Sequence, residues 1–188
     1  MNEFLSGDIF LIDSVASYAK VVKFLMQAPT VYQWAWRKMR GTQQEVRYYH
    51  AGMLVSNTHV IEQQKIVELE TVEAAFLNKK HIVYRNPRLT MESRNRLKAL
   101  AEDEIGEGYD ILLIFGKTLT WITGLGFITR LVQWVDKEIC VTRVAKWYQK
   151  VTGITFGKHS WHEVTTDNID DWCKLDEWLV VSKSTTFS

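Results

Sequence analysis

The sequence predicts an α+β fold in which a small antiparallel sheet packs against helices. Two apolar segments rich in β-branched residues, 49–55 and 59–67, flank the polar turn Ser56-Asn57-Thr58 and indicate a hairpin. Two later segments, 90–105 and the residues that follow Glu138, carry apolar residues at helical spacing. A set of strands followed by a set of helices is typical of this fold class.

The other elements of the first half can be assigned from turn and capping residues. Residues 9–12 predict a short buried strand, and residues 13–40 suit two short helices broken at Pro29. A third strand is expected at residues 81–85. Thr90 or Ser93 can cap the helix at 90–105, whose apolar stripe is Met91, Leu97, Leu100, Ala101 and Ile105.

The second half ends with two further elements. The helix after Glu138 should stop at Gly153. Thr165-Thr166-Asp167 resembles the capped start of a short helix, and residues 178–182 predict a terminal strand. The chain contains no visible repeat or linker, so we expect one domain over residues 1–188.

The composition is that of an ordinary globular protein. The chain has 188 residues, of which 46% are hydrophobic and 24% charged, enough to bury a sizeable core. A net charge of +1 gives no overall attraction to nucleic acid, so we expect no nucleic-acid partner. Two cysteines are too few for a disulfide scaffold and indicate reduced, buried or catalytic thiols.

We expect neither a signal peptide nor a transmembrane helix. The first residues include Asn2 and Glu3, and the apolar stretch at 9–12 is shorter than a signal-peptide core. Lys117 and Arg130 interrupt the most hydrophobic region and leave only twelve uncharged residues between them, against the ~20 that span a bilayer. These features favour a cytoplasmic protein, or one carried in a phage or secreted assembly.

Three residues form a candidate catalytic group: Cys140, His50 and Glu62. Cys140 lies where a helix should begin, so its sulfur would face unpaired amides and the positive end of the helix dipole, which favour the thiolate. A three-residue hairpin turn would place Glu62 opposite Gly52. A two-residue turn would instead move Glu62 to the opposite face of the sheet.

With the three-residue turn, the side chains at positions 50, 52, 62 and 64 share one face of the hairpin. The small Gly52 would leave room for the Glu62 carboxylate to reach the His50 imidazole. Glu62 would then keep one ring nitrogen protonated while the other faces Cys140, giving a thiolate and imidazolium pair.

These residues stand in blocks that resemble a known family. The blocks are Gly7-Asp8-Ile9-Phe10, His50–Val55 with Val60-Ile61-Glu62, Gly108-Tyr109-Asp110, and Cys140 on a helix ending near Gly153. The sequence is similar to the circularly permuted papain-like amidases, the YiiX-like branch of the NlpC-type cysteine peptidase superfamily. The resemblance implies a permuted papain-like fold, with His50 as base, Glu62 as orienting residue and Cys140 as nucleophile.

The resemblance also implies a function. A YiiX-like member would be a cysteine hydrolase that cleaves an amide bond in a peptide or a peptidoglycan-like cell-wall peptide through a thioester, without a cofactor. Lipid acyl transfer or ester hydrolysis at a membrane surface is an alternative, because relatives resembling lecithin-retinol acyltransferase act on lipids. The basic, tryptophan-containing cluster at 34–40 and an apolar insert at about 115–134 suit membrane docking.

A catalytically silent structural or binding module, as in a phage particle, is the third interpretation. Family members commonly carry a serine and then an acidic residue directly after the cysteine, whereas Val141 and Thr142 follow Cys140 here. Elsewhere, His159, His162 and Cys173 have side chains that bind zinc, but they lack finger spacing, so we predict no metal site.

Overall fold

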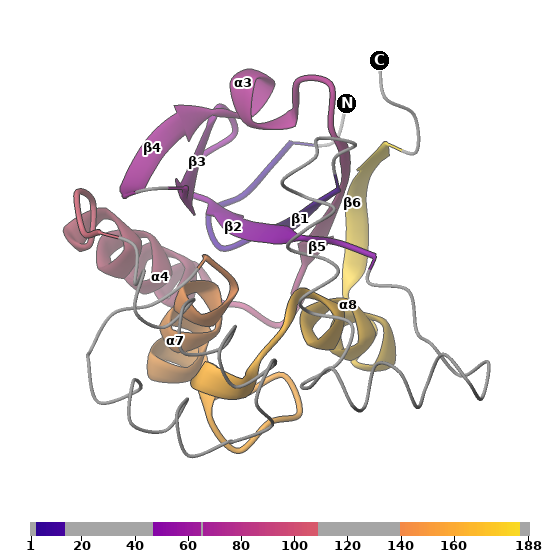
Figure 1. Cartoon of the computed structure of the whole chain (residues 1–188). Helices are drawn as coiled ribbons and strands as arrows, with labels where there is room; N and C mark the ends of the chain where they lie inside the picture. The colour runs from indigo at the N-terminus through magenta and orange to yellow at the C-terminus, as the bar shows by residue number, and fades with distance from the viewer. Residues whose placement is uncertain (1–2, 14–46, 65, 109–139, 185–188) are drawn as a thin grey trace, which may run out of the picture.

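The computed structural model describes residues 3–13, 47–64, 66–108 and 140–184, and the fold is given for these residues (Figure 1). They form an α+β fold with a six-stranded, open antiparallel sheet in the order β4-β3-β2-β1-β5-β6. The strands are β1 (Ile9–Asp13), β2 (His50–Leu54), β3 (His59–Gln63), β4 (Val67–Thr71), β5 (Lys80–Arg85) and β6 (Leu179–Ser184). The helices of these ranges are α3 (Val72–Phe76), α4 (Met91–Asp103), α7 (Cys140–Thr152), α8 (Thr166–Leu175) and the 3-10 turn η1 (Trp161–Glu163).

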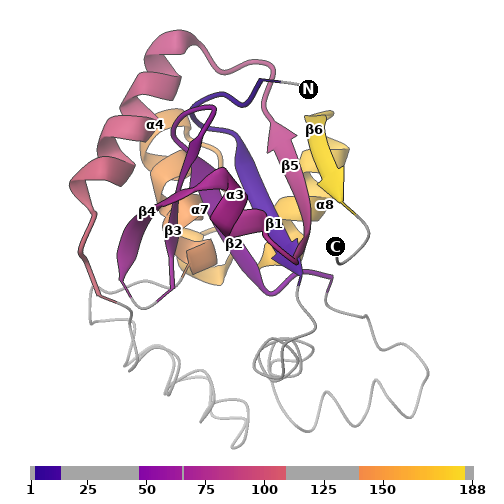
Figure 2. The same cartoon turned by 90° about the horizontal axis from the view of Figure 1, so that it is seen from above.

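The sheet separates two apolar layers because successive side chains of a strand point to opposite faces. Ile9 and Leu11 face the larger layer, which α4, α7 and α8 cover, and Phe10 and Ile12 face the smaller layer beneath α3. Figures 1 and 2 show these three helices on one side of the sheet and α3 on the other. The side chains of the first four β1 residues, 9–12, are fully buried, so β1 contributes to the middle of both layers.

The hairpin of β2 and β3 has the register that the sequence predicts. Gly52 pairs with Glu62, and the Val55 amide donates to the His59 carbonyl across the turn. The Ser56 hydroxyl accepts hydrogen bonds from the amides of Thr58 and His59 at 3.2 and 3.0 Å, which holds the three-residue turn. The predicted placement of Glu62 opposite Gly52 is therefore confirmed.

Several predicted element ends are also confirmed. The Thr90 hydroxyl accepts from the Ser93 amide and caps α4. Gly153, with φ of 77°, ends α7 in the left-handed conformation that favours glycine. Thr165 begins α8 in a reciprocal capping box with Asn168.

The predicted strand 59–67 is wrong in its second half. β3 ends at Gln63, and β4 starts at Val67 and runs back along β3. No glycine, proline, asparagine or aspartate stands between β3 and β4, so the apolar pair Ile66-Val67 suggests a continuation of the strand. The short helix α3 after β4 was not predicted either, although Thr71 caps it.

The predicted apolar stripe of the helix at 90–105 is partly wrong. Leu97 and Ala101 are fully buried, but Met91 and Ile105 are 66% and 45% exposed. Arg94 is buried instead, at 4% exposure. Arg94 faces the interior because it has a buried polar partner, which the spacing of apolar residues along the helix does not reveal.

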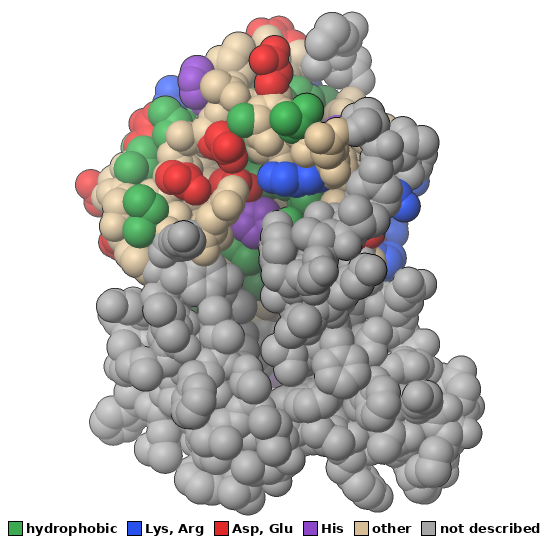
Figure 3. All heavy atoms as spheres, turned by 45° about the horizontal axis from the view of Figure 1, so that its top comes forward, with side chains coloured by type: hydrophobic (Ala, Val, Ile, Leu, Met, Phe, Trp, Pro, Cys, Tyr) green, Lys and Arg blue, Asp and Glu red, His purple; other side chains and the backbone are tan. Residues whose placement is uncertain are grey.

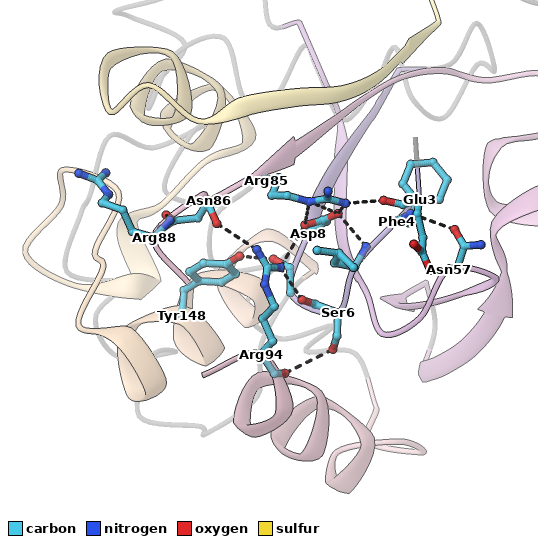
Figure 4. A network of polar contacts seen from close by, with 12 residues as sticks. Glu3, Phe4, Ser6, Asp8, Asn57, Arg85, Asn86, Arg88, Arg94 and Tyr148 are labelled. Carbon is cyan, nitrogen blue, oxygen red and sulfur yellow. Dashed lines mark hydrogen bonds and ion pairs between the residues drawn. The ribbon is translucent and has the colours of Figure 1, made fainter. Parts of the chain in front are cut away.

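That partner is Asp8, a fully buried carboxylate at the start of β1 (Figure 4). Asp8 Oδ2 lies 2.6 Å from Arg85 Nη2, and Asp8 Oδ1 lies 3.2 Å from Arg94 Nη1. Arg94 also donates to the carbonyls of Ser6 and Asn86, at 2.7 and 3.0 Å. A buried charge that lost these partners would be strongly destabilising, so the network ties β1, β5 and α4 together.

In the described part of the chain, no helix has the length and hydrophobicity needed to cross a membrane. The helices expected within 13–40, the cluster at 34–40 and the apolar insert at 115–134 lie outside the described residues, apart from Asp13.

Substitution of Gly52 by alanine should destabilise the fold. The added Cβ would lie 2.3 Å from Phe10 Cζ and 3.0 Å from Glu62 Cβ, and Phe10 is fully buried and cannot move away. Overpacking of this kind costs about 1–3 kcal/mol of unfolding free energy. Urea denaturation of Gly52→Ala beside Gly108→Ala, whose new Cβ meets no atom within 4 Å, measures the difference. Equal losses in the two variants would contradict the close packing at Gly52.

Candidate active site

His50 and Glu62 form a buried hydrogen-bonded pair across the hairpin. His50 Nε2 lies 2.8 Å from Glu62 Oε2, and the two side chains are 10% and 0% exposed. Gly52 lies between them on β2, as the sequence analysis expected. The space above Gly52 is filled mainly by the Phe10 ring, so the missing side chain accommodates this ring as well as the carboxylate.

Cys140 extends the pair into a chain of three side chains. Its thiol, on a residue only 6% exposed, hydrogen-bonds to the His50 imidazole. Because Nε2 of His50 is engaged by Glu62, Nδ1 is the ring nitrogen left for the sulfur. The structure therefore brings together all three residues that the sequence analysis selected.

Two backbone amides also donate to the Cys140 sulfur, those of Ala51 and Val141. The pairing of β2 with β3 starts at Gly52 and Glu62, so Ala51 lies just beyond it. The Leu54 amide points toward β1 and donates to the carbonyl of Asp8. Successive amides of a strand point to opposite neighbours, so the Ala51 amide, three residues earlier, points toward β3. There it bonds to the sulfur instead of to a strand.

A buried arginine fixes the helix that carries Cys140, the first described residue of α7. Arg143 Nη1 lies 2.6 Å from Glu104 Oε2 and 2.7 Å from Glu107 Oε2, and its Nε donates to Gln63 Oε1 at 3.2 Å. Arg143 is 1% and Glu104 8% exposed, so this ion pair is shielded from water, whereas Glu107 is 54% exposed. They join the first turns of α7 to the end of α4 and the end of β3.

The electrostatics of the three side chains favour the charged forms. Burial alone would lower the pKa of His50, but the charge of Cys140 and the hydrogen bonds to Cys140 and Glu62 raise it to about 10. Burial would raise the pKa of Cys140, yet the charge and hydrogen bond of His50 and the two amides lower it. The site therefore favours a thiolate beside an imidazolium, which supplies a nucleophile and a proton donor in one contact.

Glu62 keeps its negative charge in the same way. Burial would raise its pKa, but the hydrogen bond and charge of His50, with a hydrogen bond from Gln64, lower it to about 2. Gln64 Nε2 lies 2.5 Å from Glu62 Oε1. Gln64 thus lies on the predicted face of the hairpin and holds the second carboxylate oxygen.

The zinc-type residues of the C-terminal part do not come together. Cys173 is fully buried on α8 within the larger apolar layer, and burial raises the pKa of its thiol. His162 lies in η1, where its ring stacks on Trp161. Among residues 3–13, 47–64, 66–108 and 140–184, no group of three or more histidine, cysteine or acidic side chains is arranged to hold a metal ion.

Two partners of the site were missed by sequence reasoning: the Ala51 amide and Glu70. The side chain of Glu70, on β4, hydrogen-bonds to Glu62. Recognition of the reversal between β3 and β4 would have revealed it, because β4 then places alternate residues on the face that carries Glu62. An amide beside a cysteine has no sequence signal, since every residue but proline carries one.

The Glu62 carboxylate should stabilise the fold in a pH-dependent way. Its pKa is about 2 in the fold against 4.5 for a free side chain, so its stabilisation is present above about pH 4.5 and is lost as the pH falls toward 2. We expect the unfolding free energy of the wild type to exceed that of Glu62→Gln by on the order of 2–3 kcal/mol near neutral pH, and the gap to narrow below about pH 4.5. Denaturant titrations across this range measure it, with Glu68→Gln as the control. Parallel pH dependences of wild type and Glu62→Gln would contradict the assignment.

Comparison with known proteins bears on the fold. No model of a known protein family matches the sequence, and no curated protein does. The fold is similar to the crystal structure of the metalloprotein YiiX from Escherichia coli O157:H7, of the DUF1105 group, with a TM-score of 0.55 and 18% sequence identity over 98% of this chain and 92% of that one. At this identity the likeness concerns the fold alone, and it confirms the YiiX-like part of the predicted fold class.

Proposed function

We propose that this protein is a cysteine hydrolase with a permuted papain-like arrangement, which cleaves an amide bond in a peptide or a cell-wall peptide. The observation that carries the proposal is the hydrogen-bonded chain from the Cys140 thiol through His50 to Glu62. A nucleophile, a base in contact with it and a third group that orients the base are the parts that covalent amide hydrolysis needs. The histidine, acid and cysteine follow one another along the chain in the permuted order.

The first half of the reaction would form a thioester. The Cys140 thiolate attacks the carbonyl carbon, and the oxyanion that forms lies near the amides that already donate to the sulfur, those of Ala51 and Val141. His50 then gives its Nδ1 proton to the nitrogen of the leaving group. The carbon–nitrogen bond breaks, the amine departs, and the acyl group stays on the sulfur.

The second half would release the acid and restore the site. Neutral His50 removes a proton from a water molecule, and the hydroxide attacks the thioester carbonyl. The carbon–sulfur bond breaks, so the product leaves as a carboxylic acid and Cys140 returns as thiolate beside protonated His50. Throughout, Glu62 holds the Nε2 proton and so fixes the ring orientation.

The residues after the cysteine are compatible with this chemistry. Val141 is 3% exposed and belongs to the larger apolar layer, and Thr142 is fully buried. Their side chains therefore contribute to packing, while Cys140 keeps its contacts with His50. The catalytically silent alternative draws no support from their placement.

The lipid alternative depends on residues 34–40 and 115–134, which lie outside the described residues. No contact of the described part favours it over a peptide amide.

The structural neighbour is a metalloprotein, but the described side chains of this chain do not fit a metal centre. Both nitrogens of His50 already have partners, Glu62 and Cys140, and no cluster of three or more ligand-type side chains is present in the described ranges. The proposed steps therefore use only groups of the chain and water.

The proposal predicts amide cleavage that depends on Cys140 and His50. Wild-type protein and the matched control Cys173→Ala, which removes the other buried thiol, should both cleave members of a mixture of synthetic peptides and muropeptides followed by mass spectrometry. Cys140→Ala and His50→Ala should lower the rate by roughly a thousandfold or more, because members of such a group act as a unit. A hydroxylamine-sensitive acyl adduct should appear on Cys140. Cleavage that persists in Cys140→Ala would overturn the proposal.

A further inference from the structure

Glu70 lies on the edge strand β4, next to strand β3, which carries Glu62. In the pairing of β3 with β4, Glu62 is opposite Glu68 and Val60 is opposite Glu70, so both β4 glutamates share a face with Glu62. Diagonal neighbours in an antiparallel pair are within reach of long side chains. In this diagonal arrangement the Glu70 carboxyl hydrogen-bonds to Glu62.

The surroundings of Glu70 differ from those of a solvated surface charge. The face that carries α3 shows acidic side chains intermixed with hydrophobic ones (Figure 3), and Leu77, which follows α3, is 65% exposed. On this face Glu70 is half-buried, and its Oε2 atom is shielded from water and has no hydrogen-bond partner among the residues that the structure describes. An ionised oxygen in this position would be costly.

A proton on Glu70 accounts for both its hydrogen bond to Glu62 and its buried Oε2 atom. Two ionised carboxylates have no hydrogen to share, so a bond between Glu62 and Glu70 requires that one of them be protonated. Glu62 already accepts from His50 at 2.8 Å and from Gln64 at 2.5 Å, which stabilise its anion. Glu70 is therefore the partner that holds the proton and donates it to Glu62.

The groups around Glu70 agree with this assignment. Among the described residues, the charged groups that act on it are Glu62 on β3, Glu68 on its own strand and Lys79 beyond α3. Burial, the hydrogen bond to Glu62 and the charges of Glu62 and Glu68 raise the pKa of Glu70, and the charge of Lys79 lowers it by less than the charge of Glu62 raises it. Glu62, bonded to the same carboxyl, has its pKa lowered.

We propose that Glu70 is a positioning residue of the Cys140–His50–Glu62 chain and that it acts in its protonated form, as a hydrogen-bond donor to Glu62. With donors from His50, Gln64 and Glu70, the Glu62 carboxylate is held in one orientation, and the His50 ring is held toward the sulfur. The role in catalysis rests on the proposed function, whereas the shared proton can be measured without any substrate.

The test follows the carboxyl carbons of Glu62 and Glu70 by NMR over an acid titration of the full chain. In the wild type, Glu62 should titrate below and Glu70 above the ordinary 4.5 of a glutamate. Glu70→Ala removes the donor and should raise the pKa of Glu62 by about one unit. Glu70→Gln keeps a neutral donor and should leave Glu62 close to its wild-type value, as should the matched control Glu68→Gln.

The outcomes are distinct. Independent titration of both carboxyls near 4.5, or a Glu62 that titrates alike in Glu70→Ala and Glu68→Gln, would overturn the shared proton. Iodoacetamide labelling of Cys140 in a Cys173→Ala background reports the reactive thiol in the same samples. Labelling at about pH 5 should fall in Glu70→Ala and recover in Glu70→Gln, since only the amide restores the donor. Labelling that does not depend on His50 would overturn the proposed function, while the NMR result would still decide the role of Glu70.

Discussion

The hydrogen bond between His50 and Glu62 is the contact on which the candidate site depends, and the register of one hairpin sets it. A slip of one residue between β2 and β3 would turn Glu62 to the opposite face of the sheet. The three-residue turn at Ser56–Thr58, held by the Ser56 hydroxyl, opposes this slip. The geometry of one turn thus helps to decide whether the histidine has a carboxylate partner.

The position of Cys140 has a separate origin in the ion pairs of Arg143. Buried ion pairs add little net stability, because the loss of hydration offsets most of the attraction, but a broken pair is expensive. Arg143 therefore penalises any shift of α7 relative to α4 and β3. The thiol meets the imidazole where β2 passes beyond its pairing with β3, so the edge of the paired region provides both the space and the Ala51 amide.

Local signals allowed much of the fold to be predicted. The hairpin turn, the Thr90 and Thr165 caps and the glycine at 153 each act within a few residues, and the structure has them where the sequence indicates. The three candidate site residues were predicted as well, from the alternation of side chains and the resemblance to YiiX-like amidases, and they lie in contact.

Features that depend on distant partners could not be predicted. The turn before β4 has no typical turn residue, so neither that strand nor Glu70 could be placed. Burial of Arg94 requires Asp8, which lies 86 residues earlier in the chain. For Arg94 the deciding partner is close in space and far in sequence, where periodicity carries no information.

The ionisation of Cys140 tests the central claim most directly. Ultraviolet absorbance of the thiolate, taken as the difference between wild type and Cys140→Ala, should be present at about pH 6, well below the free-thiol pKa of ~8.5. In His50→Ala the absorbance should appear only at higher pH, because the imidazolium that stabilises the thiolate is gone. A thiolate signal that develops only near the free-thiol pKa, with and without His50, would contradict the account.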